Sequence, residues 1–266
     1  MSTPATEYSL AELMICANAS AYDNDGEVLV TGIGVLPRIA ASLAMLSSNT
    51  DILMTDSEAW LLSEPNPVGK RPADFKQKNE TWMGFSRIFD NVWSGRRHLT
   101  GGPTQIDRFA QANISALGDY SKPKVQMLGV RGFPGNSFCH ANSYLVPAHS
   151  TRVFIDGECD VVCTIGYNPD RLPKGYSFDD IDVRQVYTNL GVFDFRGPNR
   201  QMQIVSLHPG VTVEEVQENT GFPVHVPENI PTTAAPTEEQ LEIIRRIDPH
   251  NLRAKQLKDN PPGVRG

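Results

Sequence analysis

Cysteine is scarce in this sequence, with only four among 266 residues. They are Cys16, Cys139, Cys159 and Cys163, and they are too few and too scattered for a disulfide framework in a chain of this length. Cys159 and Cys163 lie in an apolar run without a second Cys or His pair nearby, so we expect buried thiols and not a zinc site.

Long hydrophobic runs and an excess of positive charge are also missing. No stretch approaches the roughly 18 apolar residues of a membrane-spanning helix, and the N-terminus lacks a basic region followed by an apolar one. The chain is therefore expected in the cytoplasm. The 31 acidic residues outnumber the 24 basic ones, giving a net charge of −7, which argues against nucleic acid or an anionic membrane as a partner.

Strand-like and helix-like segments alternate along the chain, as is typical of an open, mostly parallel sheet flanked by helices. Helices are predicted at 10–22, where Ser9 and Glu12 form a capping box, at 37–46 and at 85–93. Strands are predicted at 27–31, 51–55, 124–129, 152–155 and 160–165, a strand and turn at 105–115, and a loop at 66–80. The fold class is therefore predicted to be α/β.

The segment 186–222 predicts a hairpin followed by a short helix. Residues 186–195 form one β-rich run, 197–199 a turn, and 202–207 an alternating strand. Thr212 and Glu215 have capping-box spacing, and Gly221 lies where a helix C-cap is expected.

Composition changes near residue 227 and predicts a boundary there. Residues 1–226 are assigned to one α/β domain, and 227–266 to a linker, a helix at 237–247 and a flexible polar tail from 255. Leu241, Ile244 and Ile247 lie on one face of that helix and are expected to dock on a neighbour.

Three stretches closely resemble the C-terminal part of β subunits of class I coenzyme A transferases of the glutaconate type. Their sequences are T-N-L-G-V-F-D-F, L-H-P-G-V-T-V-E-E-V and T-G-F. The resemblance runs from about 26 to 222. It implies an α/β fold of that type, an α-subunit partner in an αβ or α2β2 complex, and an acyl-CoA substrate. Coenzyme A then enters only as part of the substrate, with no permanently bound cofactor.

In transferases of this class a glutamate at a strand end attacks the acyl-CoA, and a small residue and a glycine follow it. The resemblance places Asp56 at the nucleophile and Glu58 at the glycine. Aspartate is shorter by one methylene, and a misplaced nucleophile loses rate steeply, so covalent CoA transfer is not expected. Read without the resemblance, Asp56 is equally a helix cap and Glu58 a solvated carboxylate in a first helical turn.

Four segments resemble one branch more specifically, the β subunits of the actinobacterial hydrolases that open a steroid ring late in cholesterol breakdown. They are D-I-L-M-T-D-S-E-A, G-R-R-H, N-I-S-A-L-G and G-V-R-G-F-P-G-N. The implied reaction adds water to a ring ketone of a CoA-linked substrate and breaks a C–C bond to give an enolate, while the thioester survives. The principal carboxylate base is then carried by the α subunit.

The glycine-rich segment 129–136 follows a predicted strand, and its three glycines allow a sharp turn that presents N–H donors to an oxyanion. It lacks the Gly-Lys-Ser/Thr of a nucleotide P-loop, and on glycine content alone a plain surface turn is equally good. The resemblance assigns oxyanion or substrate contacts to Gly129, Val130, Arg131, Gly132, Gly135 and Asn136.

The remaining candidates are Asn113, Arg96 and Arg97. Asn113 joins Asp56 and Glu58 as a candidate catalytic residue. Arg96 and Arg97 are candidates for CoA phosphates or for the subunit interface, although such a cluster also serves to end a helix. Two rival functions stay open: a working CoA-transferase with Asp56 or Glu58 as nucleophile, and a noncatalytic scaffold that stabilises its partner.

Overall fold

The computed structural model of the protein describes residues 3–56, 59–127, 129–130 and 132–265. Two candidate site residues, Glu58 and Arg131, lie outside the described residues. Contacts divide the chain into two compact units, one made of Met1–Gly101 and Ala234–Gly266 and the other of Gly102–Thr233. The C-terminal segment therefore belongs to the same unit as the N-terminus. The sequence-based boundary at 226 stays a prediction.

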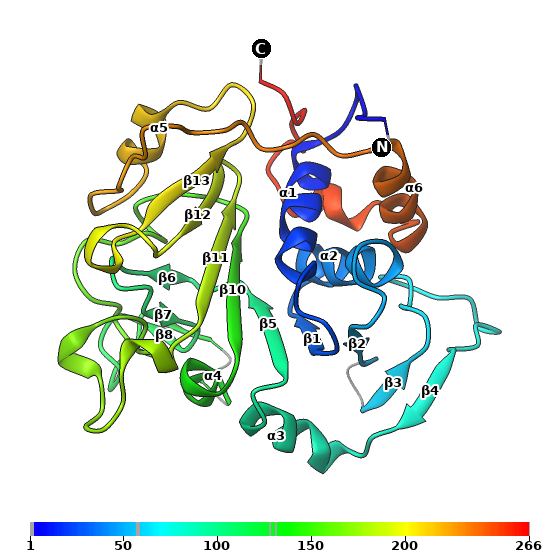
Figure 1. The fold of residues 1–266 in the computed structure, drawn as a ribbon, viewed down its shortest axis with the longest axis horizontal. Coiled ribbons are helices and arrows are strands. Elements are labelled where there is room, and N and C mark those ends of the chain that lie inside the picture. The colour runs from blue at the N-terminus through cyan, green and yellow to red at the C-terminus, as the bar shows by residue number, and fades with distance from the viewer. Residues whose placement is uncertain (1–2, 57–58, 128, 131, 266) are drawn as a thin grey trace. The chain divides into compact units, whose positions relative to one another are not determined.

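The first unit is built on three parallel strands (Figure 1). β1 (Leu29–Gly32) lies between β5 (Arg97–Gly101) and β2 (Leu53–Met54), with Leu29 paired to both Arg97 and Leu53. The predicted strands at 27–31 and 51–55 are confirmed, whereas β5 was not predicted. Its sequence begins with Arg97 and His98, which do not resemble a buried strand.

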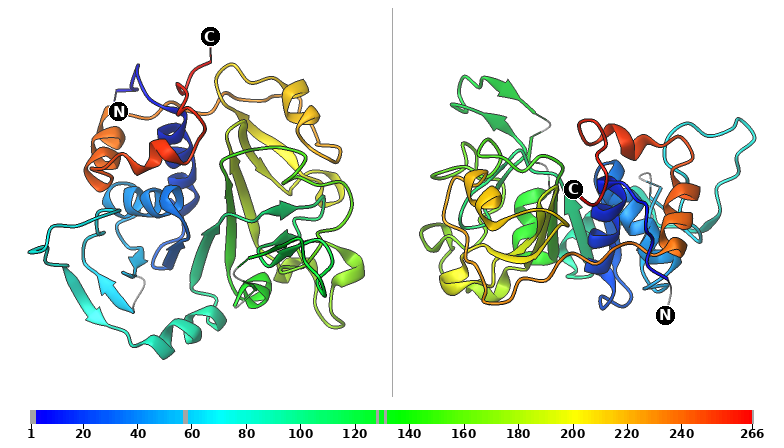
Figure 2. Two further views of the ribbon diagram at one scale, coloured as in Figure 1. Left: turned by 180° about the vertical axis from the view of Figure 1, so that it is seen from behind. Right: turned by 90° about the horizontal axis from the view of Figure 1, so that it is seen from above.

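Two predicted helices pack against each other in this unit, as both ribbon views show (Figures 1 and 2). α1 (Leu10–Ala19) continues into the 3-10 turn η1 (Ser20–Tyr22), and α2 (Val35–Leu46) follows β1. Ser9 and Glu12 form the predicted capping box at the start of α1. Most of α1 is apolar and buried, so burial on several sides, and not one amphipathic stripe, stabilises it.

The C-terminal helix α6 (Glu238–Ile247) packs on α2 and α1. Thr237 and Gln240 form its capping box, and Leu241, Ile244 and Ile247 are all buried, so the predicted docking face is confirmed. A 3-10 turn, η5 (Leu252–Lys255), follows. The tail that was expected to be flexible makes backbone contacts with the N-terminal segment, from the Leu10 N–H to the Pro261 carbonyl at 2.9 Å and from the Gly263 N–H to the Tyr8 carbonyl at 2.8 Å.

A buried ionic cluster joins α1 to this C-terminal segment. Glu12 Oε1 accepts hydrogen bonds from Arg253 at 2.9 Å and from Arg245 at 3.2 Å, while Arg253 also pairs with Asp248 at 3.0 Å. The side chains of Glu12 and Asp248 are almost completely buried. Buried carboxylates need such partners, since an unpaired buried charge is strongly destabilising.

An excursion between β2 and β5 contains a two-stranded antiparallel sheet and a helix. β3 (Trp60–Leu62) pairs with β4 (Asn79–Trp82), with Trp60 opposite Trp82. The predicted loop at 66–80 therefore ends in a strand. The helix predicted at 85–93 is confirmed as α3 (Phe85–Trp93).

The second unit contains β10 (Ala141–Val146) and β11 (Val183–Thr188) in parallel, followed by the antiparallel strands β12 (Gly191–Asp194) and β13 (Gln203–Leu207). The single run predicted at 186–195 is wrong, because it contains two strands. Thr188 Oγ1 accepts hydrogen bonds from the Leu190 and Gly191 N–H groups and closes a tight turn between them. The predicted hairpin is confirmed as β12 and β13, joined through η4 (Pro198–Arg200).

Smaller elements complete this unit, and Figure 2 shows the second of its two short hairpins extending outward in the view from above. β6 (Gln105–Ile106) pairs with β7 (Ala112–Asn113), and β8 (Ala116–Leu117) pairs with β9 (Val125–Gln126). The helices are α4 (Phe133–Cys139), η2 (Pro169–Arg171), η3 (Phe178–Asp180) and α5 (Val213–Glu218). β10 was not predicted.

Three further expectations for this unit need correction. Residues 152–155 and 160–165 form only isolated bridges, at Phe154 and Thr164, because the backbone turns tightly after Ser150 and around the 160s. The N-cap of α5 is Thr212, whose hydroxyl accepts from the Glu215 N–H in agreement with the predicted spacing, but the helix ends at Glu218 with Asn219 as its C-cap. Gly221 instead packs against the backbone of residues 154–156, which leaves no room for a side chain.

Among the described residues, every helix is too short or too polar to cross a bilayer.

Candidate functional site

Asp56 follows β2 and is held by hydrogen bonds to both of its carboxylate oxygens. Oδ1 accepts from the Trp60 N–H at 3.2 Å, and Oδ2 accepts from Gln77 Nε2 at 2.9 Å. The Asp56 N–H in turn donates to the Trp60 carbonyl at 3.2 Å. The next described element is the strand β3, so Asp56 closes a strand connection and does not cap a helix.

Gln77 is itself oriented by two neighbours, and sequence reasoning missed it. Its Oε1 accepts from Asn66 Nδ2 at 2.7 Å, and its Nε2 also donates to Asn79 Oδ1 at 2.6 Å. Asn66 is only 2% exposed, so burial holds its side chain in place next to Gln77. Residues 66–80 show no hydrophobic periodicity, and their polar composition is that of an ordinary surface loop.

A half-buried arginine also lies close to Asp56. Arg38 on α2 donates from Nη2 to the Thr55 carbonyl at 2.8 Å. Burial and the neighbouring Arg71 lower the pKa of Arg38, and the charge of Asp56 partly opposes that shift. The approach of α2 requires Gly32, where an added Cβ would lie 2.7 Å from the Arg38 nitrogen. This close approach explains why glycine occupies position 32.

Arg96 and Arg97 differ in their surroundings. Arg96 is exposed, whereas Arg97 is half-buried and donates from Nε to Thr31 Oγ1 at 3.0 Å. Burial lowers the pKa of Arg97. Arg97 and His98 begin β5 and do not end α3, which stops at Trp93. His98 is buried, and its Nδ1 lies 2.7 Å from Asp25 Oδ2.

In the second unit Asn113 is fully buried at the end of β7, and its amide organises the following turn. Nδ2 donates to Gln105 Oε1 and to the Ala116 carbonyl, both at 2.7 Å, while Oδ1 accepts from the Ser115 N–H at 2.9 Å. Both amide hydrogens are therefore committed to the fold. A catalytic role for Asn113 stays a prediction.

The neighbouring Asp107 is buried at the turn between β6 and β7. Burial raises the pKa of Asp107 to about 6, even though the N–H groups of Phe109, Cys159 and Gln111 donate to it. Gln111 Nε2 bridges Asp107 at 2.9 Å and Glu158 at 3.1 Å. These contacts give Asp107 and Gln111 a structural role in this turn.

The glycine-rich segment leads directly into α4. Gly129 has φ +85° in open space, so its backbone conformation, and not crowding, favours glycine there. Gly132 is the exposed N-cap of α4, and Val130 and Gly135 are half-buried. Asn136 is buried, and its Oδ1 lies 2.8 Å from His140 Nε2. The helix α4 begins at Phe133, so Gly135 and Asn136 are helical and do not belong to a glycine-rich turn, and the Asn136 side chain is used inside the unit.

The candidates fall into two groups. Asp56, Arg96 and Arg97 belong to the first unit, and Asn113 with the glycine-rich segment belongs to the second. The roles assigned to all of these residues stay predictions. Within the described ranges, no group of three His, Cys, Asp or Glu side chains is arranged to hold a metal ion.

Comparisons with known proteins place the chain in a family. It is 42% identical over 250 residues to the cholesterol ring-cleaving hydrolase IpdB subunit of Mycobacterium tuberculosis, covering 93% of this chain and 98% of that protein. It is 31% identical to one of the subunits of the 3-oxoadipate CoA-transferase of Pseudomonas knackmussii, covering 91% and 94%. No protein-family profile matches the sequence.

A solved structure agrees with these relatives. The crystal structure of IpdAB from Rhodococcus jostii RHA1 superposes with a TM-score of 0.87 at 40% identity, covering 95% of this chain and 100% of that one. The predicted α/β fold, with a mostly parallel sheet flanked by helices, is confirmed. The chain belongs to the CoA-transferase-like family of β subunits that includes the cholesterol ring-cleaving hydrolase IpdB subunits.

Proposed function

We propose that this chain is the β subunit of a heteromeric enzyme that opens a carbocyclic ring by hydrolysis in a CoA-linked intermediate of steroid breakdown. The observation that carries the proposal is the 42% identity to a cholesterol ring-cleaving hydrolase subunit over nearly the whole of both chains. The departure of the Asp56-Ser57-Glu58 segment from the transferase pattern supports the same choice.

The proposed reaction is a retro-Claisen cleavage. Water adds to a ring ketone of the substrate, and the C–C bond between that carbon and its neighbour breaks. One product end becomes a carboxylate, while the electron pair passes to the neighbouring carbon as an enolate that is then protonated. The thioester stays intact, so the enzyme needs a general base and oxyanion donors and not a carboxylate nucleophile.

This chain would contribute a fixed carboxylate and a backbone turn. Asp56 accepts two hydrogen bonds that orient its short side chain. This arrangement suits an electrostatic or water-orienting role better than nucleophilic attack. The segment 129–136 would supply N–H donors to the enolate oxygen.

The proposed partner is an α subunit, in an αβ or α2β2 complex, which would carry the principal base. The IpdAB structure is named for two subunits. Coenzyme A would enter only with the substrate, and no cofactor would be held permanently. We place the complex in the cytoplasm, where acyl-CoA intermediates are available.

The test is product analysis by mass spectrometry in H2(18)O with the co-purified complex. A ring-ketone acyl-CoA should give one new carboxylate that carries heavy oxygen, with the thioester intact. Acetyl-CoA with free carboxylic acids should give no CoA transfer. Movement of CoA to the acid would instead establish a transferase.

A genuine CoA-transferase is the second candidate, favoured by the relative of that activity and by the carboxylate at the end of β2. It would form a CoA thioester at the carboxylate of Asp56 or Glu58. Borohydride reduction of the complex incubated with acyl-CoA, followed by peptide mass analysis, would detect that adduct.

A further inference from the structure

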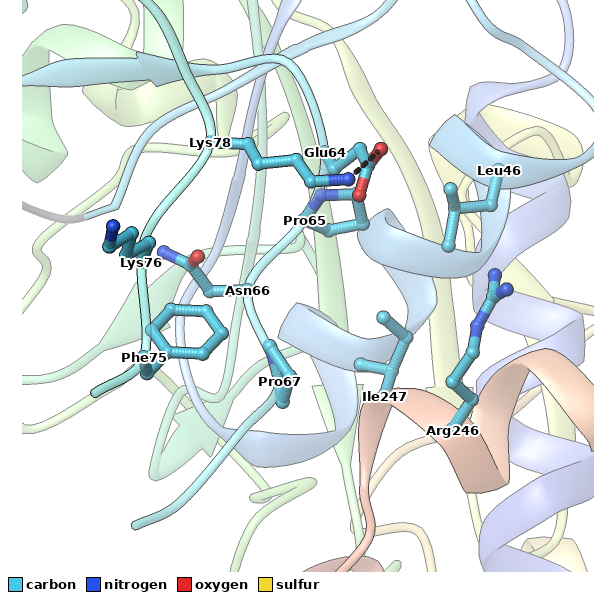
Figure 3. A pocket seen from close by; sticks show the side chains of 10 residues that line it. All are labelled: Leu46, Glu64, Pro65, Asn66, Pro67, Phe75, Lys76, Lys78, Arg246 and Ile247. Atoms are coloured by element: carbon cyan, nitrogen blue, oxygen red, sulfur yellow. Dashed lines mark hydrogen bonds and ion pairs between the residues drawn. The ribbon is translucent and has the colours of Figure 1, made fainter. Parts of the chain in front are cut away.

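Asn66 lies in the loop between β3 and β4, and prolines on both sides restrict its backbone. Figure 3 shows it between Pro65 and Pro67, with its side chain directed toward the segment that carries Phe75 and Lys76. Proline fixes its own φ at about −65°, and it also confines the residue before it to extended conformations. The Asn66 backbone therefore has few alternatives, and its side chain is buried.

The C-terminal segment anchors the residues that follow Asn66. The Val68 N–H donates to the Ile247 carbonyl at the end of α6, at 2.8 Å. Gly69 comes next with φ +88°, and an added Cβ there would lie 2.8 Å from Leu252 Cδ1 on η5. This part of the loop is fixed to α6 and η5, so Asn66 is a rigid support for its neighbours.

Gln77 makes three hydrogen bonds whose directions decide which way its amide is turned. Its Oε1 accepts from Asn66 Nδ2 at 2.7 Å, while its Nε2 donates to Asp56 Oδ2 at 2.9 Å and to Asn79 Oδ1 at 2.6 Å. Turning the amide over would set Oε1 against the Asp56 carboxylate and Nε2 against the donor of Asn66. The donor of Asn66 therefore helps to keep the donor of Gln77 on Asp56.

The backbone around Asp56 is held by contacts that do not involve Gln77. Arg38 Nη2 donates to the Thr55 carbonyl at 2.8 Å, and the Asp56 N–H donates to the Trp60 carbonyl at 3.2 Å. Gln77 instead contacts the carboxylate itself, and it reaches Asp56 from a different segment of the chain. A change at Asn66 can therefore alter the orientation of the carboxylate without moving the end of β2.

We infer that Asn66 is a positioning residue for Asp56 and acts through Gln77. The loop holds Asn66, Asn66 keeps the amide of Gln77 turned, and Gln77 Nε2 holds the carboxylate at one rotation about its side-chain bond. A carboxylate held at one angle can orient the attacking water, whereas one that rotates spends part of its time out of place. This inference rests on the proposed function, because it assumes that Asp56 takes part in ring opening.

The test compares the kinetics of ring opening by the co-purified complex with two variants that remove hydrogen bonds and keep an apolar side chain of similar size. Gln77→Leu should lower kcat about tenfold, because its bond goes to a charged group, and Asn66→Leu about fivefold, the effect of one neutral hydrogen bond. KM should stay unchanged, since neither residue is proposed to contact the substrate.

The pH dependence separates positioning from a merely structural role. In both variants the acid limb of the pH–rate profile should move to higher pH, because a carboxylate that loses a donor takes up a proton more readily. The matched control is Asn24→Leu, the same exchange at an exposed asparagine of the first unit, which should change neither kcat nor the acid limb.

A double variant tests whether Asn66 acts through Gln77. Asn66→Leu/Gln77→Leu should be no slower than Gln77→Leu alone, and a crystal structure of the Asn66→Leu complex should show Gln77 displaced from Asp56. Losses that multiply in the double variant would overturn the inference, as would an unchanged Gln77–Asp56 contact in that structure. A complex that opens no ring, yet in which Asn66→Leu displaces Gln77, would support the positioning and refute the proposed hydrolysis.

Discussion

Glu12 is predicted to contribute more to stability through its arginine partners than through its helix cap. Its Oε2 accepts from the Ser9 N–H at 2.9 Å, and its Oε1 accepts from both Arg245 and Arg253. Glu12→Gln keeps an oxygen for the cap but removes the charge. It leaves the guanidinium of Arg253, which is 9% exposed, with Asp248 alone.

The expected losses in the free energy of unfolding distinguish the ion pairs of Glu12 from its role in the helix cap. Breaking a buried pair costs about 3–5 kcal/mol, and Asp248 still compensates Arg253, so Glu12→Gln should cost about 3 kcal/mol in the free energy of unfolding. Ser9→Ala removes only the cap and should cost about 1 kcal/mol. Glu7→Gln, at an exposed position nearby, should cost nothing measurable.

Urea unfolding followed by circular dichroism measures all three variants. Burial alone would raise the pKa of Glu12, but the Ser9 N–H and the two arginines bring it below its ordinary value. The wild-type advantage over Glu12→Gln should therefore be complete above the unfolded pKa of about 4.3 and fall as pH drops through the lower folded value. If Glu12→Gln costs no more than Ser9→Ala at pH 7, the ion pairs make no net contribution.

Three further predictions follow from the structure. Burial lowers the pKa of His149 to about 3. Neutral His149 therefore contributes fully to the free energy of unfolding above the unfolded pKa of about 6.5, and this contribution is lost as the pH falls toward 3. His149→Gln should flatten this part of the pH dependence of the free energy of unfolding, measured with urea. Gln77→Glu places a second carboxylate beside Asp56 and should lower kcat about tenfold while shifting the acid limb of the pH–rate profile upward, whereas a profile like wild type would show that Asp56 does not act in turnover. Gly166→Ala, at φ +50° with an added Cβ only 2.6 Å from backbone carbon, should prevent soluble expression, while Gly157→Ala, at φ +87° in open space, should cost only about 1 kcal/mol by thermal unfolding.

Sequence patterns predicted those parts of the fold where local chemistry decides the structure. The capping box at Ser9 marks a true helix start, and the apolar face of α6 is buried as its spacing indicates. These features depend on neighbours within one or two turns of a helix. The family was recognised from the amino-acid sequences of longer segments. Hydrophobic periodicity indicates helices and strands but does not identify a family.

The sequence-based predictions are wrong where contacts between residues far apart in the sequence determine the structure. β5 begins with Arg97 and His98, and its strand form depends on pairing with β1, which the local sequence does not reveal. Phe154 and Thr164 resemble strand residues but make only isolated bridges. Gln77 and Asn66 have no signal at all in the sequence, because their importance comes from their distance to Asp56 after folding.

The ionic cluster at Glu12 has a consequence for the synthesis of the chain. Glu12 leaves the ribosome 241 residues before Arg253, its most buried partner. The second unit is continuous in sequence and can form while the C-terminal segment is still being made, whereas the first unit must wait for α6 and the tail. Until then the face of α2 that receives α6 stays open, so a chain cut short after residue 233 would expose an apolar surface and a buried acid without its base. Release of the last residues therefore acts as the step that completes the fold.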